Sequence, residues 1–536
     1  MNTGAPQRFA DWLAGRLKAA GLKRAFGVPG GGTSLDLLTA LRDQGIDTVL
    51  TAREDAAVIM AGVSGRLANA PGLAFTTKGP GLASATNGLA SAVLDRLPAL
   101  LVTEAFEDSE LGFLSHQVYD QAGLAASLLA NGKAGVLGAD AGAIDAWLAG
   151  GQTGLLGPAV MLPDATDMNR AAIPGAGTPE KSKNIPDADI ARAHKLLQAS
   201  RRPVVVIGLE AARPGMSGPL RGFFESLGAA VLCTYMAKGC VADNHPSYAG
   251  IFTGGAIEQA CVGEADLIVL LGLDPVELIR KPWAYSAPVL DICEIAHNPH
   301  YITPAERLVG PLFNTLAAFG GMSLETTWTS DDISNHRNRF FQGMEIMAEN
   351  GLSSSDVVQA TAAVFNGVPR LAVDAGAHMF SACTFWPARE PLDVLISNGL
   401  ATMAFAVPAV IAAALHDPTR GAVAMIGDGG MMMCLGELKT AVETKAKVCI
   451  IVFNDGCLSL IDLKRAERQL PDVGLSWECP DFAAIAEGFG LAAWRVDDGD
   501  KLRPALEAAA AENGPSLIDV RIDASGYPAQ TKTLRG

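Results

Sequence analysis

The chain has 536 residues, more than one hydrophobic core normally supports, so about two to four domains are expected. Apolar residues make up 49% of it and charged residues 18%, which is typical of compact α/β proteins and excludes a disordered or fibrous chain. The formal net charge of -16 comes from acids spread along the chain, and no block of Lys and Arg is present, so nucleic acid is not an expected partner.

The nine cysteines and the amino terminus indicate a compartment. The cysteines form no Cys-x-x-Cys pair and most lie in apolar runs, which favours buried, reduced thiols over disulfides or a zinc site. The amino terminus has no secretory apolar stretch, and no uninterrupted apolar run reaches membrane-spanning length. The sequence therefore predicts a cytoplasmic protein with no membrane partner.

Three regions alternate short apolar runs with helical patterns rich in Ala, Gly and Leu, which is typical of parallel sheets wound by helices. The predicted fold class is α/β, with three doubly wound parallel-sheet domains at residues 1–172, 186–330 and 345–536. The strands predicted in the first domain are 24–28, 48–50, 72–77 and 99–103.

The connections and the two later domains follow from the same patterns. Residues 173–185 are rich in Pro, Gly, Lys and Asn and are predicted to be a linker, and the polar segment around 330–332 is predicted to be a second connection. The elements predicted in the second domain are a helix at 188–198 and strands at 203–208 and 265–272. Those predicted in the third domain are strands at 371–374, 422–426 and 448–453 and a buried helix over 431–444.

Two predicted strands of the third domain end in acidic turns. The first runs into Gly427-Asp428-Gly429-Gly430 and the second into Asn454-Asp455-Gly456. Ligands of doubly wound sheets bind at the carboxyl ends of strands, where glycines let backbone N–H groups approach a phosphate closely. A carboxylate from each turn can hold Mg²⁺, which in turn binds a diphosphate. A single Gly-Asp-Gly turn is a weak signal, because such turns also serve as tight connections.

The pairing of the two turns is more specific. In order and spacing it resembles the thiamine-diphosphate motif of the superfamily of acetohydroxyacid synthase, benzoylformate decarboxylase and pyruvate decarboxylase. The resemblance implies that Asp428, Asp455 and the backbone carbonyl of Cys457 bind Mg²⁺, with Asp455 at a position that is Asn in many members. The residues that it places against the diphosphate are Gly427, Gly429 and Gly430.

The segment 397–408 resembles the family's segment beneath the thiazolium ring, which places Ala401 and Met403 at the cofactor. Met403 matches the large apolar residue that forces the cofactor to bend, so that its 4′-amino group lies beside C2. By residue type alone, a Met on a Gly/Ala-rich helix fits plain core packing. His378 matches a family histidine near the diphosphate, and it can equally be a hydrogen-bonded core residue.

A cofactor that activates itself needs a carboxylate at N1′ of its aminopyrimidine ring. Glu54 follows the predicted strand 48–50, begins an Ala/Gly-rich helix and resembles the family's catalytic glutamate. An acid in the first turn of a helix is also favourable without any catalytic role. The metal motif elsewhere in the chain favours the catalytic interpretation. Gly30 and Gly31 resemble the family's opening loop.

The resemblance covers nearly the whole chain. It implies a pyrimidine-binding domain first, a central domain and a diphosphate-binding domain last. Because the family builds each site from the first domain of one subunit and the third domain of another, it implies a homodimer at least and favours a homotetramer.

Four positions bear on the substrate. His116 and Gln117 lie where acetohydroxyacid synthases carry a Phe-Gln pair, so Gln117 matches, while His116 either relays protons or lies at the surface. Ile461 keeps the apolar character of a substrate-pocket position. Lys464 replaces a Trp there, and it either recognises an anionic group or projects into water.

The leading hypothesis is an acetolactate-synthase-like decarboxylase or carboligase that uses thiamine diphosphate and Mg²⁺ and acts on a 2-oxo acid. The alternatives are a thiamine-diphosphate-dependent lyase that cleaves a 2-hydroxyacyl or diketone substrate, a non-catalytic thiamine-diphosphate-binding homologue, and an unrelated α/β nucleotide-binding enzyme. Gly208 and Gly272 follow strands of the central domain, a pattern too common to predict a nucleotide, so FAD is not predicted.

Overall fold

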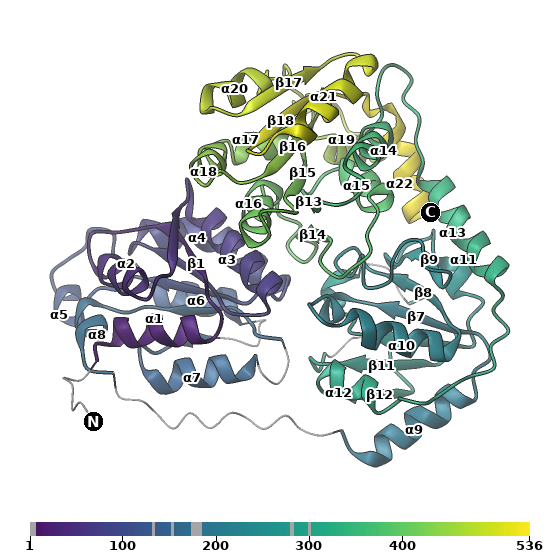
Figure 1. Cartoon of the computed structure of the whole chain (residues 1–536), viewed down its shortest axis with the longest axis horizontal. Coiled ribbons are helices and arrows are strands. Elements are labelled where there is room, and N and C mark those ends of the chain that lie inside the picture. Colours follow the sequence, from purple (N-terminus) through teal and green to yellow (C-terminus); the bar gives the residue numbers. More distant parts are fainter. Residues whose placement is uncertain (1–6, 131–134, 152–154, 173–184, 279–282, 298–301) are drawn as a thin grey trace. The chain divides into compact units, whose positions relative to one another are not determined.

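The computed structural model describes residues 7–130, 135–151, 155–172, 185–278, 283–297 and 302–536 (Figure 1). Its strands form three six-stranded sheets, and the strand pairs within each sheet are parallel. The predicted α/β fold class with three parallel sheets is confirmed. The predicted linker, apart from Ile185, lies outside the described residues, and the predicted domain bounds stay a prediction.

The first sheet has the strand order β2-β1-β3-β4-β6-β5, which reverses between β1 and β3. Its strands are β1 (Arg24–Val28), β2 (Asp47–Leu50), β3 (Gly72–Thr76), β4 (Ala99–Thr103), β5 (Val136–Leu137) and β6 (Ala159–Met161). Its helices are α1 (Phe9–Ala19), α2 (Thr33–Asp43), α3 (Glu54–Ala68), α4 (Pro80–Leu94), α5 (Asp108–Leu111), α6 (Gln121–Leu129), α7 (Ala141–Gly150) and α8 (Ala165–Asn169).

The core of the first sheet explains its helical cover. Leu73 and Phe75 alternate along β3, so they point to one face, where they pack in a cluster with Leu13 and Leu17 of α1. Helices α3 and α4 pack against each other closely at Gly88, where an added Cβ would lie 2.3 Å from the backbone oxygen of Asp55. Only glycine permits that approach.

The second sheet has the order β12-β11-β10-β7-β8-β9, which reverses between β10 and β7. Its strands are β7 (Pro203–Ile207), β8 (Ala230–Cys233), β9 (Tyr248–Ile251), β10 (Leu267–Leu271), β11 (Val289–Cys293) and β12 (Glu306–Val309). Its helices are α9 (Asp187–Gln198), η1 (Leu209–Ala211), α10 (Ser217–Leu227), α11 (Gln259–Val262), η2 (Pro275–Glu277) and α12 (Leu312–Ala317).

The third sheet has the order β14-β13-β15-β16-β18-β17, which reverses between β13 and β15. Its strands are β13 (Arg370–Val373), β14 (Val394–Ile396), β15 (Ala422–Gly427), β16 (Val448–Asn454), β17 (Ala492–Val496) and β18 (Ser516–Arg521). Its helices are α14 (Ser354–Phe365), α15 (His378–Phe385), α16 (Ala406–His416), α17 (Asp428–Met433), α18 (Glu437–Glu443), α19 (Ser459–Glu467), α20 (Phe482–Phe489), α21 (Gly499–Ala511), η3 (Ala524–Gly526) and α22 (Tyr527–Arg535).

The polar segment around 330–332, predicted to be a connection, forms the start of α13 (Ser330–Met344), where Thr329 and Asp332 form a capping box, with contacts of 3.1 Å in each direction. The prediction of one helix over 431–444 is wrong. The single helix predicted over 431–444 is broken into α17 and α18. Residues 434–436 form a turn between the two helices, and a Cβ added at Gly436 in this turn would lie 2.7 Å from the Cβ of Ala52.

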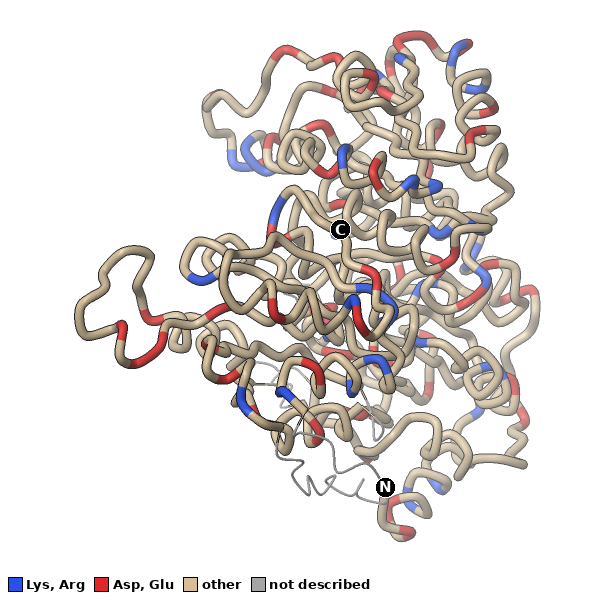
Figure 2. Tube along the Cα trace, turned by 60° about the vertical axis from the view of Figure 1, so that its left-hand side comes forward, with Lys and Arg blue, Asp and Glu red and all other residues tan. Residues whose placement is uncertain are grey.

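The two compact units are residues 1–181, 411–417 and 435–446, which contain the first sheet, and residues 182–410, 418–434 and 447–536, which contain the other two sheets. Acidic and basic residues are interspersed along the Cα trace (Figure 2). Among the described residues, no helix has both the length and the apolar character that crossing a membrane requires. The nine cysteines all lie among the described residues and form no disulfide; seven are buried, and Cys457 and Cys479 are partly exposed.

Candidate cofactor site

A cavity of about 240 Å³ lies at the carboxyl edge of the third sheet. The strand order reverses here between β13 and β15, and such a reversal is where doubly wound sheets bind ligands. Ten predicted site residues line the cavity: His378, Ala401, Met403, Gly427, Asp428, Gly429, Gly430, Asp455, Cys457 and Ile461. The fold thus brings residues from distant parts of the chain to one edge.

Asp428 begins α17 and is only 2% exposed. Its Oδ1 accepts the N–H of Gly429 and its Oδ2 accepts the N–H of Gly456, each at 2.9 Å. The second contact joins the turn after β15 to the turn after β16. Burial, followed by the negative charge of Asp455, raises the pKa of Asp428 to about 6. A cation between the two carboxylates would relieve both effects.

Asp455 is held by the turn that follows it. Ser459 donates its hydroxyl to Oδ2 at 2.5 Å, and the N–H of Cys457 donates to Oδ1 at 3.1 Å. Burial raises the pKa of Asp455, and these two hydrogen bonds oppose that rise. Asp428 and Asp455 therefore offer hard oxygen ligands from two turns fixed to each other, which fits Mg²⁺.

Glycines keep room beside these carboxylates. A Cβ added at Gly430 would lie 2.2 Å from Oδ2 of Asp374, so no larger residue fits there without movement. At Gly429 it would lie 3.2 Å from the side-chain ends of Leu458 and Met403, inside the cavity. At Gly427 the nearest atom would be in the His378 ring, at 3.4 Å. The turn therefore leaves the close approach that a diphosphate requires.

Met403 does not lie on a helix, as the sequence interpretation had it, but in a turn that precedes α16. The buried carboxylate of Asp374 fixes this turn by accepting three backbone N–H groups, those of Ala404 at 2.9 Å, Phe405 at 2.7 Å and Ala406 at 3.1 Å. Burial raises the pKa of Asp374 to about 7, while these three hydrogen bonds oppose the rise.

The backbone beside Met403 is strained. Ala401 has a φ of 54° and Ala404 a φ of 67°, both in the left-handed region that non-glycine residues rarely adopt. Such strain persists only where surrounding contacts enforce it, and it gathers at functional sites. Here the Asp374 contacts hold the half-buried Met403 side chain at the cavity.

His378 is 3% exposed and stacks on Phe453, with ring centroids 5.1 Å apart. Burial lowers its pKa to about 4, and a hydrogen bond to the backbone of Met425 opposes that shift. Within the described part of the chain its Nε2 has no hydrogen-bond partner. A buried polar atom at a cavity without a partner points to a ligand. These residues together fit thiamine diphosphate with Mg²⁺.

Several residues of this site carry no motif and were missed by the sequence reasoning. Asp374, Tyr527 and Trp477 are the main ones: Tyr527 lines the cavity and is 3% exposed, and Trp477 hydrogen-bonds Asp428 through its side chain. The N–H of Trp477 also donates to the carbonyl of Gly456 at 2.8 Å. Only Asp374 had a usable signal, since it follows β13 at the same sheet edge as Asp428.

Glu54 and the opening loop lie in the other compact unit. Glu54 is the first residue of α3 and is half-buried. The N–H of Gly30 donates to the Ser34 hydroxyl at 3.1 Å, and a Cβ added at Gly30 would lie 2.4 Å from Oγ1 of Thr77. Gly31 is exposed. The loop with Gly30 and Gly31 follows β1, at the reversal between β1 and β3, whereas Glu54 follows β2, the strand beside β1.

His116 and Gln117 are exposed in the same unit. Gln117 has a φ of 63°, and its carbonyl lies so close to Gly79 that an added Cβ there would be 2.7 Å away. The Tyr119 hydroxyl also donates to the carbonyl of Gly79, at 2.9 Å. The loop with Gln117 is therefore fixed on the turn before α4, and the exposed His116 side chain agrees with the surface alternative.

The two residues after the metal turn differ in their surroundings. Ile461 lines the cavity and is 48% exposed. Lys464 is exposed on α19 and is not among the described residues that line the cavity. Its position favours the solvated alternative.

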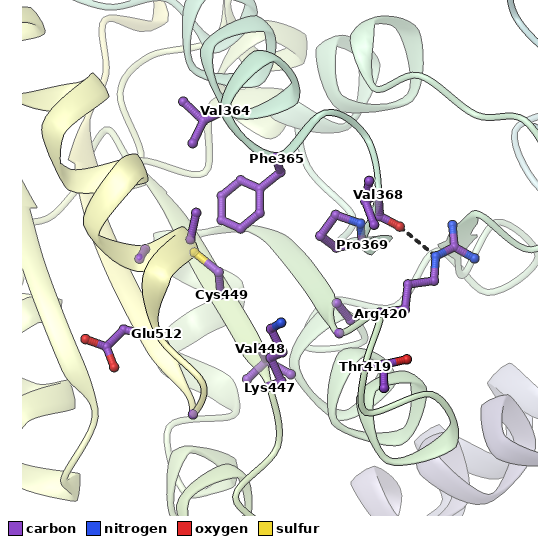
Figure 3. Close-up of a pocket in the computed structure, with 15 residues that line it drawn as sticks. Val364, Phe365, Val368, Pro369, Thr419, Arg420, Lys447, Val448, Cys449 and Glu512 are labelled. Carbon is purple, nitrogen blue, oxygen red and sulfur yellow. Dashed lines mark hydrogen bonds between the residues drawn. The ribbon is translucent and has the colours of Figure 1, made fainter.

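A second cavity, of about 230 Å³, lies at the amino edge of the third sheet (Figure 3). Residues that precede β13, β15 and β16 line it, and Arg420 there donates to the carbonyl of Val368 at 2.6 Å. None of the predicted site residues is among the described residues that line it. The chemistry of the third sheet is therefore concentrated at the opposite edge.

Three family models match the chain in the order in which its sheets occur. The N-terminal binding domain of thiamine pyrophosphate enzymes matches residues 7–125, the central domain residues 190–318, and the C-terminal binding domain residues 374–520. Thiamine pyrophosphate is another name for thiamine diphosphate. The chain belongs to the thiamine pyrophosphate enzymes. The third match contains the cavity residues from Asp374 to Ile461, and the first contains Glu54.

Curated members of this family are similar over nearly their full length. The acetolactate synthase of Bacillus subtilis is 25% identical, over 97% of this chain and 94% of the relative. A probable acetolactate synthase large subunit of Methanocaldococcus jannaschii is 28% identical, over 96% and 92%. The pyruvate oxidase of Lactiplantibacillus plantarum is 26% identical, over 94% and 87%.

Proposed function

We propose that the protein is an acetolactate-synthase-like enzyme that uses thiamine diphosphate and Mg²⁺ to decarboxylate a 2-oxo acid. The remaining acyl unit is then either protonated and released as an aldehyde or joined to the carbonyl carbon of a second substrate. The observation that carries this proposal is the cavity in which Asp428 and Asp455 face glycines and the unpartnered Nε2 of His378. The similarity to acetolactate synthases supports the reaction class.

The chain's own residues have distinct tasks in this proposal. Asp428, Asp455 and the carbonyl of Cys457 hold Mg²⁺, which binds the diphosphate. An anionic diphosphate beside His378 favours protonation of Nε2, which then donates a hydrogen bond. When bound, thiamine diphosphate supplies a carbon nucleophile for the substrate carbonyl and accepts the electron pair that the departing CO₂ leaves behind.

Glu54 holds a proton at N1′ of the aminopyrimidine ring, as the matching family glutamate implies. Met403, held at the cavity by its strained turn, would contact the cofactor when it is bound. Leu458, Leu460 and Ile461 give the cavity an apolar wall that excludes water from the reacting carbonyl.

The first test is calorimetric titration with thiamine diphosphate in the presence and absence of Mg²⁺. We expect binding that requires Mg²⁺. Absence of Mg²⁺-dependent binding would remove the proposal together with the lyase and non-catalytic alternatives. A panel of 2-oxo acids, assayed for CO₂ release and for aldehyde or acyloin products, then separates decarboxylase from carboligase. A 2-hydroxyacyl or diketone substrate cleaved without CO₂ release would favour the lyase.

Replacement of the proposed acid tests the mechanism. We expect Glu54→Gln to leave the Kd for thiamine diphosphate within about threefold and to lower kcat by at least ~10²-fold, as is typical for loss of a proton-transfer partner. Unchanged turnover contradicts the role of Glu54. Asp55→Asn, which alters the neighbouring acid in the same first helical turn, is the matched control.

We also propose that the protein is a cytoplasmic homodimer or, more fully assembled, a homotetramer. The support is the family pattern in which one subunit supplies the pyrimidine-binding domain and another the diphosphate-binding domain. Analytical ultracentrifugation tests this directly, and a monomer with full activity contradicts it.

A further inference from the structure

A buried carboxylate reaches the segment that leads into Glu54. Glu437 begins α18 and belongs to the same compact unit as α3. Its Oε1 accepts the N–H of Ala52 at 3.1 Å and the N–H of Arg53 at 3.0 Å. Its Oε2 accepts the hydroxyl of Thr440 at 2.7 Å. The backbone N–H groups of the two residues immediately before Glu54 are thus bound by one side chain from a distant part of the chain.

The burial of Glu437 makes these contacts costly to lose. The residue is 0% exposed, and a buried carboxylate is tolerated only when hydrogen bonds replace its water shell. Burial raises the pKa of Glu437, while the hydrogen bonds from Thr440, Ala52 and Arg53 oppose the rise. The acceptor capacity of this buried group is directed mainly at the backbone before Glu54.

Packing brings α18 as near to this segment as glycine allows. A Cβ added at Gly436 would lie 2.7 Å from the Cβ of Ala52. On the other side, the hydroxyl of Thr51 donates to the carbonyl of Arg53 at 2.8 Å. Both polar groups of Arg53's backbone are therefore fixed.

These contacts fix the residues that lead into α3 rather than the N–H groups of its first turn. Arg53 occupies the N-cap of α3 in an extended conformation (φ −139°, ψ 151°), and its side chain makes no capping hydrogen bond. The direction in which α3 starts depends instead on Glu437 and Thr51. Because Glu54 is the next residue, the same contacts set the direction of its Cα–Cβ bond.

We propose that Glu437 is a positioning residue for Glu54. It acts through the peptide groups of Ala52 and Arg53, and it touches no reacting atom. This inference rests on the proposed catalytic role of Glu54. A shift of about 1 Å in a proton-transfer group costs up to about 10²-fold in rate, so the effect on kcat is measurable.

Substitution of Glu437 gives a graded kinetic test. In Glu437→Gln the amide oxygen still accepts both N–H groups and the amide nitrogen donates to Thr440, so we expect kcat within about threefold of wild type. In Glu437→Ala water replaces the carboxylate, because Ala52 and Arg53 are exposed. We expect kcat to fall at least ~10-fold, with KM for the 2-oxo acid and Kd for thiamine diphosphate changed less than about threefold.

The control variant is Glu443→Gln, which changes an exposed acid at the end of the same helix that pairs only with Lys439 in the described contacts. It is expected to match wild type in every measurement. Thr440→Val, which removes only the contact to Oε2, keeps the test open should Glu437→Ala fail to fold, and we expect a fall in kcat of about two- to fivefold.

Amide hydrogen exchange in the cofactor-free protein tests the contact without relying on catalysis. We expect faster exchange at Ala52 and Arg53 in Glu437→Ala than in wild type, Glu437→Gln or Glu443→Gln. Equal protection in all four proteins overturns the inference, as does faster exchange with an unchanged kcat. If Glu54→Gln keeps full turnover, the proposed role of Glu54 fails instead, whatever the exchange experiment gives.

Discussion

The second and third sheets are both parallel and six-stranded, and each has a reversal of strand order at which a ligand could bind, although their strand orders differ. Their carboxyl edges are nevertheless finished in opposite ways. At the second sheet a Cβ added at Gly208, after β7, would lie 2.4 Å from Cα of Leu273, after β10. The two turns thus close on each other. At the third sheet the corresponding position, Gly427, has its nearest neighbour at 3.4 Å, and a cavity remains.

The second edge satisfies its backbone donors with its own carboxylates. Glu277 accepts the N–H of Leu209 at 2.8 Å and that of Asp274 at 3.4 Å. Glu210 accepts the N–H of Glu294 at 2.6 Å. Doubly wound sheets bind phosphates at such a reversal, and here the N–H groups named above are bound by carboxyl groups of the protein itself.

The same edge contains a histidine between two acids. Nε2 of His297 lies 3.3 Å from Oε1 of Glu210 and 3.6 Å from Oδ2 of Asp274. Ligand atoms of these three residues lie within 4.8 Å of one another, the one such group found among the described residues. The imidazole already bridges both carboxylates, and no unpartnered atom of the group points to an ion. A reversal of strand order is therefore not enough to make a binding site. The edge must also keep polar atoms without partners and room beside its glycines for a ligand.

The largest effect is expected from removing Asp428 at the carboxyl edge of the third sheet, where the cavity lies. We expect Asp428→Ala to weaken Mg²⁺-dependent binding of thiamine diphosphate at least ~100-fold, because a metal ligand and the link to the N–H of Gly456 are both lost. Asp455→Asn retains an oxygen ligand and is expected to stay within about tenfold. Calorimetry with Mg²⁺ measures both, and equal affinity of Asp428→Ala and wild type would place the metal elsewhere.

Substitution of two neighbouring glycines distinguishes room that the fold needs from room that the ligand needs. A Cβ at Gly430 meets the carboxylate of Asp374 at 2.2 Å, so we expect Gly430→Ala to lower the free energy of unfolding by about 1–3 kcal/mol. At Gly429 the nearest atoms are flexible side-chain ends at 3.2 Å, so Gly429→Ala is expected to keep the wild-type Tm and weaken thiamine diphosphate about tenfold. Thermal denaturation without cofactor and calorimetry distinguish the two. Equal loss of stability in both variants contradicts this division.

The sequence predicted the two acidic turns at the carboxyl edge of the third sheet because each turn is a short run of residues directly after a strand. Asp428 and its glycines follow one predicted strand, and Asp455 and Cys457 follow another. The observed strands β15 and β16 end within one residue of the predicted bounds. Short apolar runs in the sequence likewise predicted the positions of β1 and β4. The sheets could be predicted because buried parallel strands are near-continuous apolar runs.

What the sequence could not predict depends on backbone contacts between distant segments. Glu437 and Glu277 are single acids that bind N–H groups of other turns, and no pattern in the chain marks such a partner. Asp374 binds N–H groups in the same way, and its only signal is its place directly after β13. The break between α17 and α18 has the same origin, since packing of Gly436 on Ala52 ends a pattern that reads as one helix.

The smallest expected effect tests whether backbone N–H groups at the carboxyl edge of the second sheet are bound by carboxyl groups of the protein itself. Burial raises the pKa of Glu277 to about 8, above the value of about 4.3 of an exposed Glu. The folded protein therefore keeps a proton that the unfolded chain releases. Stability from this group is fully present below about pH 4 and is lost as the pH rises to about 8.

Glu277→Gln copies the protonated form, since its amide oxygen accepts the N–H groups of Leu209 and Asp274 and its nitrogen donates to the Thr234 hydroxyl. We expect a Tm gain over wild type of about 2–4 °C at pH 8.5, a much smaller gain at pH 5 and none at pH 4. Glu325→Gln, at a side chain that is 91% exposed, is the control. An equal gain at all three pH values means that Glu277 is not neutral in the folded protein, and the closed edge then needs a cation of its own.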